Sequence, residues 1–480
     1  MMSKDIDLEK YFKPDLKQAR MRRKDVNYLT FELEDEFLGI GHGKNYRIQT
    51  YGCQGNEADS EIMAGLFEKM GYQEAQSETD ADIILLNTCA VRESAENRIW
   101  GELGRLKSLK RNNPNLLLGL CGCMAQEENV VNRILKKYPY VDIVFGTHNL
   151  HQLPYYIKSA MFDQERVIEV YSYEGSIVEN LPKARAFKHK AWINIMFGCD
   201  EFCTYCIVPY TRGKERSRSK DEILAEVNDL VKQGYQEITL LGQNVNAYGK
   251  DFKDLDYTFG DLLVDLDKTG IERIRFTTSH PRDIDQKTIT AFENCKHVMP
   301  HLHLPLQSGS NNVLKKMNRG YTKEIYLDAI KKLRQARPDI SLTTDIIVAF
   351  PTESEADFKE TISLLEEVGF EGAYTFIFSP RYGTPAYNYP NDISKNEQKG
   401  RLRQLNKVVN QGYLNGSLRF LNKTVKVLVD GFSKKDDTIL SGYSEHNKLV
   451  NFQGDASLIG TIVDVKIKEA MTWFLIGELA

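Results

Sequence analysis

The chain has 480 residues, a hydrophobic content of 41%, a charged content of 27% and a formal net charge of −4 at pH 7. This balance excludes a globally basic surface for nucleic acid, so any such surface must be local. The length predicts about three domains. Because no apolar run reaches the roughly 18 residues of a membrane span and the first residues are polar, we expect no membrane helix and no secretory signal, and we predict a cytoplasmic protein.

Residues 1–44 are predicted to form an N-terminal extension. A basic cluster between Lys17 and Lys24 is followed by the acidic run Glu32–Glu36. A solvated arm is the simplest interpretation of such charge blocks, and an arm that contacts RNA is the alternative.

Residues 45–160 alternate between strand-like and helix-like patterns. Strands are expected over Tyr46–Tyr51, Ala81–Leu86, Leu116–Leu120 and Val141–Phe145, and helices over Ser60–Met70 and Glu93–Lys110. This alternation predicts an α/β domain with a parallel sheet and helices on both faces.

Three cysteines follow three of these strands. Cys53, Cys89 and Cys123 each lie just past a strand end, one βαβ unit apart. Because the carboxyl ends of parallel strands meet along one edge, we expect the three thiols to converge there as a metal site. Cys121 lies two residues from Cys123 and competes with it, although Cys123 is favoured.

Residues 161–190 are expected to form a linker with one or two strands, and the segment from Pro182 to Lys220 is basic. It carries nine basic residues against three acidic ones, a net charge of +6, which predicts a site for a carboxylate ligand or for RNA phosphates. The basic residues are Lys183, Arg185, Lys188, Lys190, Arg212, Lys214, Arg216, Arg218 and Lys220.

Residues 191–415 contain six strand-like runs separated by helical stretches, which predicts a partial (β/α)6 barrel. The runs are Trp192–Phe197, Glu237–Leu241, Arg273–Thr278, His301–Leu306, Ser341–Val348 and Ala373–Phe378. Active sites in such barrels lie at the carboxyl ends of the strands, where this chain has polar residues such as Asn244, Gln307 and Ser308.

Directly after the first of these strands, Cys199, Cys203 and Cys206 stand in the spacing C-x3-C-x2-C. One short loop with this spacing can wrap three thiolates around one metal cluster. A 4Fe–4S cluster has four irons, so three cysteines leave one iron open to an outside ligand.

Residues 416–480 are rich in short β-type runs punctuated by glycine and aspartate. They predict a small antiparallel β-barrel, an architecture that often binds oligonucleotides. Eight basic and eight acidic residues balance each other there, so charge alone does not indicate nucleic-acid binding.

The cysteine loop, with Tyr205 before its third cysteine, resembles the radical S-adenosylmethionine (SAM) superfamily. The wider stretches Gln49–Ser60, Asn87–Arg92, Gly122–Gln126 and Phe197–Arg218 resemble the methylthiotransferase family within it. The C-terminal barrel resembles a TRAM domain. The stretches Gln49–Ser60 and Glu445–Phe452 are most similar to the branch that acts on N6-dimethylallyladenosine in tRNA. Gly55 departs from the methionine that is usual there.

The resemblance implies two 4Fe–4S clusters, one on Cys199, Cys203 and Cys206 that binds SAM, and an auxiliary one on Cys53, Cys89 and Cys123. Cys121 and Cys295 are then bystanders. It also implies that one SAM supplies a radical and another a methyl group, and that the substrate is the prenylated adenosine at position 37 of the tRNA anticodon loop. An electron donor such as flavodoxin or ferredoxin and an Fe–S carrier are the further partners expected.

Candidate side chains for SAM are Tyr205, Asn244, Gln307 and Ser308, chosen by their place after the barrel strands or in the cysteine loop. Phe350, Phe378 and Tyr382 are candidates for an apolar pocket around the prenyl group, with packing as the alternative.

Two alternatives to this function stay open at this point. The first keeps the reaction but changes the target to threonylcarbamoyladenosine in tRNA or to a ribosomal-protein aspartate. The second is a non-catalytic Fe–S sensor that binds RNA through the terminal barrel.

Overall fold

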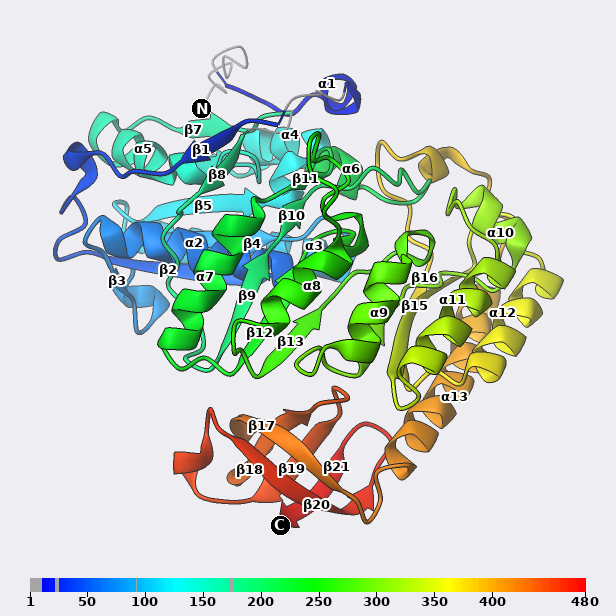
Figure 1. Ribbon diagram of the computed structural model, residues 1–480. Coiled ribbons are helices and arrows are strands. Elements are labelled where there is room, and N and C mark those ends of the chain that lie inside the picture. Colours follow the sequence, from blue (N-terminus) through cyan, green and yellow to red (C-terminus); the bar gives the residue numbers. More distant parts are fainter. Residues whose placement is uncertain (1–10, 22–25, 92, 173–175) are drawn as a thin grey trace. The chain divides into compact units, whose positions relative to one another are not determined.

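The computed structural model describes residues 11–21, 26–91, 93–172 and 176–480 (Figure 1). The chain divides into two compact units. The first comprises residues 1–186, 197–200 and 206–218, and the second comprises residues 187–196, 201–205 and 219–480. None of the described helices is long and apolar enough to cross a membrane.

A six-stranded parallel sheet forms the centre of the first unit, as predicted. Its order is β3 (Gln73–Glu74), β2 (Asn45–Tyr51), β4 (Ile83–Thr88), β5 (Leu117–Gly122), β6 (Ile143–Phe145) and β7 (Val167–Glu169). Every residue of β4 and β5 is buried, because helices cover both faces.

The two faces of this sheet carry separate apolar cores. Residues of α3 (Glu93–Asn112) and α4 (Glu128–Lys137) belong to one core, and residues of α2 (Gln54–Lys69) and α5 (Leu153–Lys158) belong to the other. Helix α2 begins six residues earlier than the predicted Ser60. Asn56 caps it by accepting a hydrogen bond from the backbone N–H of Cys53 at 3.3 Å, a short-range interaction that hydrophobic periodicity does not detect.

Parts of the expected extension and linker form strands that pair within the first unit. Strand β7 is the sixth strand of the sheet, and it lies in the range expected to be a linker with one or two strands. Strand β8 (Ile177–Glu179) pairs in parallel with β1 (Tyr28–Thr30), so the described part of the extension is anchored. The short helix α1 (Leu16–Arg20) precedes β1. Residues 1–10 and 22–25, which include part of the predicted basic cluster, lie outside the described residues.

The second unit contains an arc of six parallel strands, which confirms the partial barrel. The strands are β9 (Lys190–Asn194), β12 (Glu237–Leu241), β13 (Arg273–Phe276), β14 (His301–His303), β15 (Ser341–Val348) and β16 (Gly372–Ile377). They form two three-stranded sheets, β13-β12-β9 and β14-β15-β16, and a single parallel bridge between Ile274 and Val298 links them.

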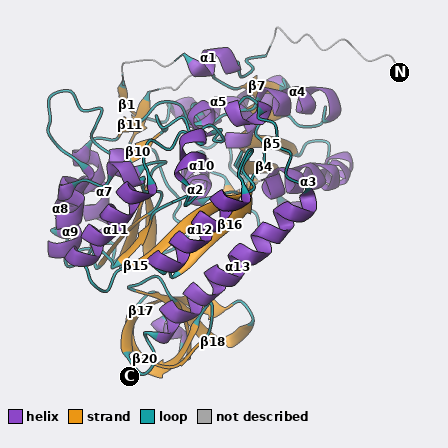
Figure 2. Cartoon of the chain, turned by 90° about the vertical axis from the view of Figure 1, so that its right-hand side faces the viewer, coloured by secondary structure: helices purple, strands orange, loops and turns teal. Residues whose placement is uncertain are grey.

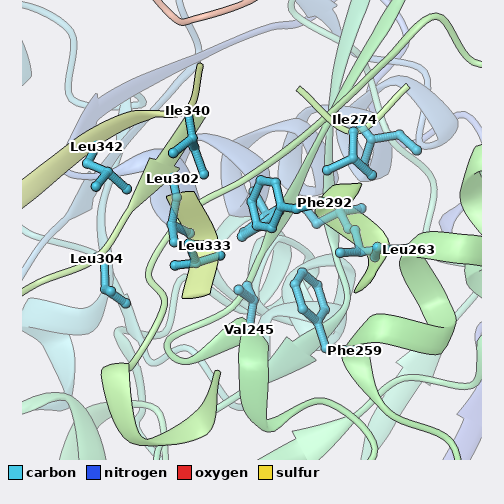
Figure 3. Close-up of a cluster of buried hydrophobic side chains, with 14 of the residues drawn as sticks. Val245, Phe259, Leu263, Ile274, Phe292, Leu302, Leu304, Leu333, Ile340 and Leu342 are labelled. Atoms are coloured by element: carbon cyan, nitrogen blue, oxygen red, sulfur yellow. The ribbon is translucent and has the colours of Figure 1, made fainter. Parts of the chain in front are cut away.

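Helices cover the outside of this arc (Figure 2). They are α7 (Lys220–Lys232), α8 (Phe259–Asp267), α9 (Gln286–Asn294), α11 (Lys323–Ala336), α12 (Glu355–Val368) and α13 (Lys395–Leu418). Their apolar faces pack on the strands, as Phe292 of α9 and Leu333 of α11 do beside Ile274 and Leu302 (Figure 3).

The first barrel strand is shorter than predicted. Strand β9 ends at Asn194, and the following β10 (Met196–Phe197) pairs instead with β11 (Arg216–Ser217). The cysteine loop and the short helix α6 (Val208–Thr211) therefore lie between two paired strands, which bring the ends of the segment together.

Residues 424–479 form the closed barrel that was expected. Its order is β17 (Thr424–Ser433), β18 (Asp436–Ser444), β19 (Leu449–Gln453), β21 (Leu475–Leu479) and β20 (Ile462–Ala470). Four neighbouring pairs are antiparallel, and the pair β19–β21 is parallel.

The small barrel docks on the amino-terminal ends of the arc strands. Arg273, the first residue of β13, donates to the carbonyl oxygens of Tyr443 at 2.9 Å and Lys426 at 3.0 Å. Arg275 donates to those of Ser444 at 2.7 Å and Glu445 at 3.1 Å. The barrel therefore lies at the opposite end of the strands from the polar residues that follow them.

Candidate functional site

Cys53, Cys89 and Cys123 form one group, which we call the sheet-edge site. They follow the carboxyl ends of β2, β4 and β5, which are neighbours in the sheet. A hydrogen bond between the two side chains lowers the pKa of Cys53 to about 5 and raises that of Cys89. The topology thus brings together three thiols that are far apart in the sequence.

A glycine makes the turn that separates Cys123 from its strand. Gly122 has a φ of +88°, and a Cβ there would lie 2.4 Å from Asn87 Oδ1 and 2.6 Å from Thr88 O. The left-handed turn interrupts the strand alternation, and Cys123 begins a 3-10 turn. Cys121, still inside β5, is buried in the core with its sulfur 3.7 Å from Met63 Sδ.

Two buried asparagines join the strand ends behind the sheet-edge site. Asn56 Nδ2 donates to Asn87 Oδ1 at 3.0 Å, and Asn87 Nδ2 donates to the Asn56 carbonyl at 2.7 Å. Both side chains are fully buried. Since these bonds link the first turn of α2 to β4, they fix Cys53 relative to Cys89 without any ligand.

One buried arginine contacts the sheet-edge site. Arg212 Nε donates to Cys123 Sγ at 3.1 Å, and its Nη2 pairs with Asp59 Oδ2 at 2.7 Å. Burial lowers the pKa of Arg212, but Asp59 and the neighbouring thiols outweigh it and raise the pKa well above its usual range. Arg212 is therefore charged, and its charge is neutralised by a carboxylate.

Cys199, Cys203 and Cys206 follow one another in a single loop, and we call these three residues the loop site. Cys199 and Cys203 are buried and Cys206 is half-buried. Gly198, with a φ of +77°, starts the loop, and a Cβ there would lie 2.0 Å from the Lys214 carbonyl oxygen. The backbone N–H of Cys199 donates to the Gly213 carbonyl at 3.0 Å, which ties the start of the loop to the chain beyond it.

The segment after the helix α10 (Asn311–Lys316) holds the middle of the loop. Met317 O accepts from the backbone N–H of Thr204 at 3.0 Å, and Asn318 Nδ2 donates to the Phe202 carbonyl at 3.1 Å. Arg319 Nη1 then donates to Cys203 Sγ at 3.2 Å. Arg319 was not predicted, because no local pattern links it to a cysteine 116 positions earlier.

Tyr205 packs beneath the loop site. It lies against Phe350 with ring centroids 6.5 Å apart, in a small core that includes Phe378. Phe350 and Phe378 are buried, so packing, the alternative to a prenyl pocket, describes them. Tyr382 remains exposed and contacts Tyr387 edge-on.

A buried cluster of polar side chains lies at the ends of β12 and β13. Asn244 Nδ2 donates to Asp283 Oδ2 at 2.6 Å, and one ligand atom each of Glu201, His280 and Asp283 lies within 4.8 Å of the others. Arg282 pairs with Glu201 and Lys250 pairs with Asp283, so the two carboxylates are already neutralised by cations and the cluster is poorly suited to a metal ion. Burial, aided by Arg319, lowers the pKa of His280 to about 2, so its ring is neutral.

Several buried polar atoms at these strand ends have no hydrogen-bond partner within the described chain. They are Asn244 Oδ1, Asn246 Oδ1 and Nδ2, Ser279 Oγ, both ring nitrogens of His280, and Gln307 Oε1. The backbone is strained in the same places, since the non-glycine residues Thr278, Gln307 and Ala349 have φ values of +66°, +71° and +56°. Orphaned polar atoms on strained turns are expected where a polar ligand binds.

Ser308 differs from the other candidates. Its side chain is fully buried, its hydroxyl lies 3.3 Å from Thr361 Oγ1, and it accepts from the backbone N–H of Ser310 at 3.2 Å. These bonds join the turn to α12 and give Ser308 a structural role, and its contact with SAM stays a prediction.

Four arginines of the predicted basic segment bond within the protein. Arg212, Arg216 and Arg218 are buried, and Arg218 pairs with Glu179 at 2.6 Å. Arg185 pairs with Glu61 at 2.8 Å. These arginines bond within the protein, so they do not form an exposed surface for RNA phosphates. The sequence pattern could not distinguish paired from solvated charges.

Three family models match the chain. The radical SAM superfamily matches residues 193–365, the uncharacterized protein family UPF0004 matches residues 45–146, and the TRAM domain matches residues 418–480. The matched ranges include the loop site, the sheet-edge site and the closed barrel, respectively. Radical SAM membership implies SAM and a 4Fe–4S cluster as cofactors.

Curated relatives match over nearly the whole length. The tRNA-2-methylthio-N(6)-dimethylallyladenosine synthase of Oceanobacillus iheyensis is 57% identical over 468 residues, 97% of this chain and 90% of that protein. That of Bacillus subtilis is 54% identical over 480 residues, 98% of this chain and 94% of that protein. The chain belongs to the tRNA-2-methylthio-N(6)-dimethylallyladenosine synthase family. This membership confirms the resemblance seen in the sequence.

Among solved structures, the radical SAM methyltransferase TsrM from Kitasatospora setae is similar in fold. The TM-score is 0.53 at 10% identity, covering 72% of this chain and 75% of that one. At 10% identity this similarity supports the α/β fold of the chain, and it carries no statement about function.

Proposed function

We propose that this chain is a radical SAM methylthiotransferase that adds a methylthio group to C2 of N6-dimethylallyladenosine at position 37 of the tRNA anticodon loop. The observation that carries the proposal is the presence of two separate three-cysteine sites in one chain of this family. A sensor needs no second open iron, whereas sulfur insertion uses one site for the radical and another for the sulfur.

Three cysteines for each cluster would leave one iron of a 4Fe–4S cluster open. The loop site and the sheet-edge site each offer three thiols, and the other two cysteines, Cys121 and Cys295, are buried in apolar cores. Thiolates are the ligands that iron–sulfur clusters use in proteins. The division of the chain follows, with the auxiliary site in residues 45–160, the SAM site in residues 191–415 and the RNA-binding barrel in residues 416–480.

At the loop site, the chain would hold a 4Fe–4S cluster on Cys199, Cys203 and Cys206. When bound, that cluster supplies the electron that cleaves SAM to methionine and a 5′-deoxyadenosyl radical. Tyr205 supports the loop from below, and the unpartnered atoms of Asn244 and Gln307 are suited to the polar groups of SAM. Their burial excludes water, so each bond to the ligand is strengthened by the low local dielectric.

At the sheet-edge site, Cys53, Cys89 and Cys123 would hold the auxiliary cluster. When bound, that cluster supplies the sulfur, which a second SAM methylates. Cys53 is exposed while Cys89 and Cys123 are buried, so the site has one open side. The Arg212–Asp59 pair supports Cys123 from the buried side.

The closed barrel is the proposed contact for tRNA. Trp473 is 65% exposed, and Phe432 and Tyr443 are exposed as well. Single-stranded RNA bases stack on such aromatic side chains, which suits a barrel without excess positive charge. A low-potential electron donor such as flavodoxin or ferredoxin, an Fe–S carrier and a cytoplasmic location complete the proposal.

The test is mass spectrometry of tRNA nucleosides from a strain that lacks the gene. We expect the prenylated adenosine without its methylthio group, and recovery when the wild-type gene is returned. Retention of the group in the deletion strain would refute the proposal. Loss from threonylcarbamoyladenosine, or from a ribosomal-protein aspartate, would support the alternative targets. A deletion strain complemented with the Cys123→Ala variant serves as the matched control and should stay unmodified.

A further inference from the structure

The guanidinium of Arg319 is buried at the loop site, where it donates to Cys203. It is 5% exposed and donates to Cys203 Sγ, to the Pro305 carbonyl at 3.2 Å and to Tyr321 Oη at 3.2 Å. Among the residues that the structure describes, no carboxylate oxygen lies within the 4.0 Å of an ion pair. Its counterpart Arg212 at the sheet-edge site does have one, in Asp59.

An unpaired buried cation is costly, by several kcal/mol in typical proteins. It persists where something else compensates the charge. Three thiolates and the carboxylate of SAM would supply negative charge at this position, and the reduced cluster carries one negative charge more than the oxidised one. The cation therefore favours reduction.

Contacts within the protein hold the guanidinium in place. Tyr321 Oη donates to the Leu306 carbonyl at 2.8 Å and also accepts from Arg319 Nε, while Asn318 fixes the preceding backbone to the loop. Since these contacts come from the protein alone, the charge is already oriented toward Cys203.

We propose that Arg319 is a positioning residue that raises the reduction potential of the cluster at the loop site, by its positive charge and by the N–H···S bond to Cys203. The inference rests on the proposed cluster at Cys199, Cys203 and Cys206. Both charge and hydrogen bonds to sulfur are known to set such potentials. The step concerned takes one electron from a low-potential donor, which is oxidised, to the cluster, which is reduced.

Arg212 and Arg319 differ in the net charge that they bring to their sites. Arg212 makes a similar N–H···S bond but forms a neutral pair with Asp59, so it brings no net charge to the sheet-edge site. We therefore expect the loop-site cluster to be the more easily reduced of the two. The difference would direct the electron to the site that binds SAM.

The test is a redox titration followed by electron paramagnetic resonance on anaerobically reconstituted full-length protein. The variants are Arg319→Met and Arg319→Lys, each made with and without Cys53→Ala, Cys89→Ala and Cys123→Ala so that the loop-site signal is also seen alone. Arg403→Met, which removes an exposed arginine on α13, is the control for charge. Iron and sulfide content are measured in parallel.

In Arg319→Met we expect unchanged iron and a midpoint potential at least ~59 mV more negative, which is a tenfold fall in the ratio of reduced to oxidised cluster for a one-electron couple. Arg319→Lys should shift less, and Arg403→Met not at all. An unchanged potential in both Arg319 variants would overturn the inference. Loss of iron in both would overturn it too, because Arg319 would then serve assembly. Absence of a reducible cluster in the wild-type protein would instead refute the proposed function.

Discussion

The two three-cysteine sites reach the same ligand set from opposite kinds of architecture. The loop site places its cysteines within eight residues and fixes them by backbone bonds to Gly213 and Met317. The sheet-edge site takes one cysteine from each of three neighbouring strand ends and fixes them by the sheet itself and by the Asn56–Asn87 bonds. The first is made by local sequence and the second by topology.

The comparison teaches that ligand number and ligand environment are set separately. Each site receives one buried N–H from an arginine to one sulfur, at 3.1 Å from Arg212 and 3.2 Å from Arg319. Within the described residues, Arg212 forms an ion pair with a carboxylate, Asp59, whereas Arg319 forms none. Two sites with equal numbers of thiols thus differ in local charge, and this difference is open to experiment.

The strongest test removes one ligand from each site in turn. Cys203→Ala should abolish formation of 5′-deoxyadenosine from SAM, because the radical-generating cluster loses a ligand. Cys123→Ala should keep that reaction and lose methylthiolation. Iron content should fall from about eight to about four per chain in each, by the four irons of one cluster. The measurements are chromatography of deoxyadenosine and iron analysis. Deoxyadenosine from Cys203→Ala would break the assignment of the loop site, and Cys295→Ala, a buried cysteine outside both sites, is the control.

A second test separates the arginine environments. Asp59→Asn leaves Arg212 buried without a carboxylate, and breaking a buried pair in this way typically costs about 3–5 kcal/mol. We expect the urea midpoint of the first unit to fall accordingly. Asp392→Asn removes the same charge from an exposed side chain and should change the midpoint little. An unchanged midpoint in Asp59→Asn would show that the pair does not stabilise the sheet-edge site.

The smallest expected effects come from two glycines of the sheet-edge site. In Gly122→Ala, the alanine must adopt a positive φ, and its Cβ meets Asn87 and Thr88. The strain should lower the free energy of unfolding by an amount on the order of 1–3 kcal/mol, with partial loss of iron.

At Gly55, in the first turn of α2, a Cβ would lie 3.6 Å from Cys53 Sγ, an ordinary contact. Gly55→Ala should stabilise by roughly 0.5–1 kcal/mol and keep its iron. Melting temperatures and iron content check both, and equal losses in the two variants would contradict the account of the turn.

The elements of the fold were largely predictable because each has a local signature. Strands β12 and β15 have the predicted bounds, and the cysteines after β2 and β4 could be placed by the spacing of βαβ units. The choice between Cys121 and Cys123 was harder, since period-2 alternation puts them on one face. The positive φ of Gly122 breaks that alternation, and the backbone angle of a single glycine cannot be predicted from the sequence.

The partners of the cysteines could not be predicted. Arg212 meets Asp59 from 153 positions away, and Arg319 meets Cys203 from 116. Such contacts depend on how strands and loops pack. From the composition, Arg212 and Arg218 were predicted to belong to a basic cluster that binds a ligand or RNA, whereas both are buried. The unpartnered atoms of Asn246 and Ser279 are likewise visible only once neighbouring strand ends are side by side.

The docking of the terminal barrel has a consequence for how this family can diversify. Arg273 and Arg275 bind four main-chain carbonyl oxygens of the barrel, and those oxygens are present whatever side chains the barrel carries. Substitutions at exposed positions such as Trp473 therefore leave these hydrogen bonds between the barrel and the arc of strands intact. The barrel can therefore vary in its side chains while these main-chain bonds to the arc of strands are kept.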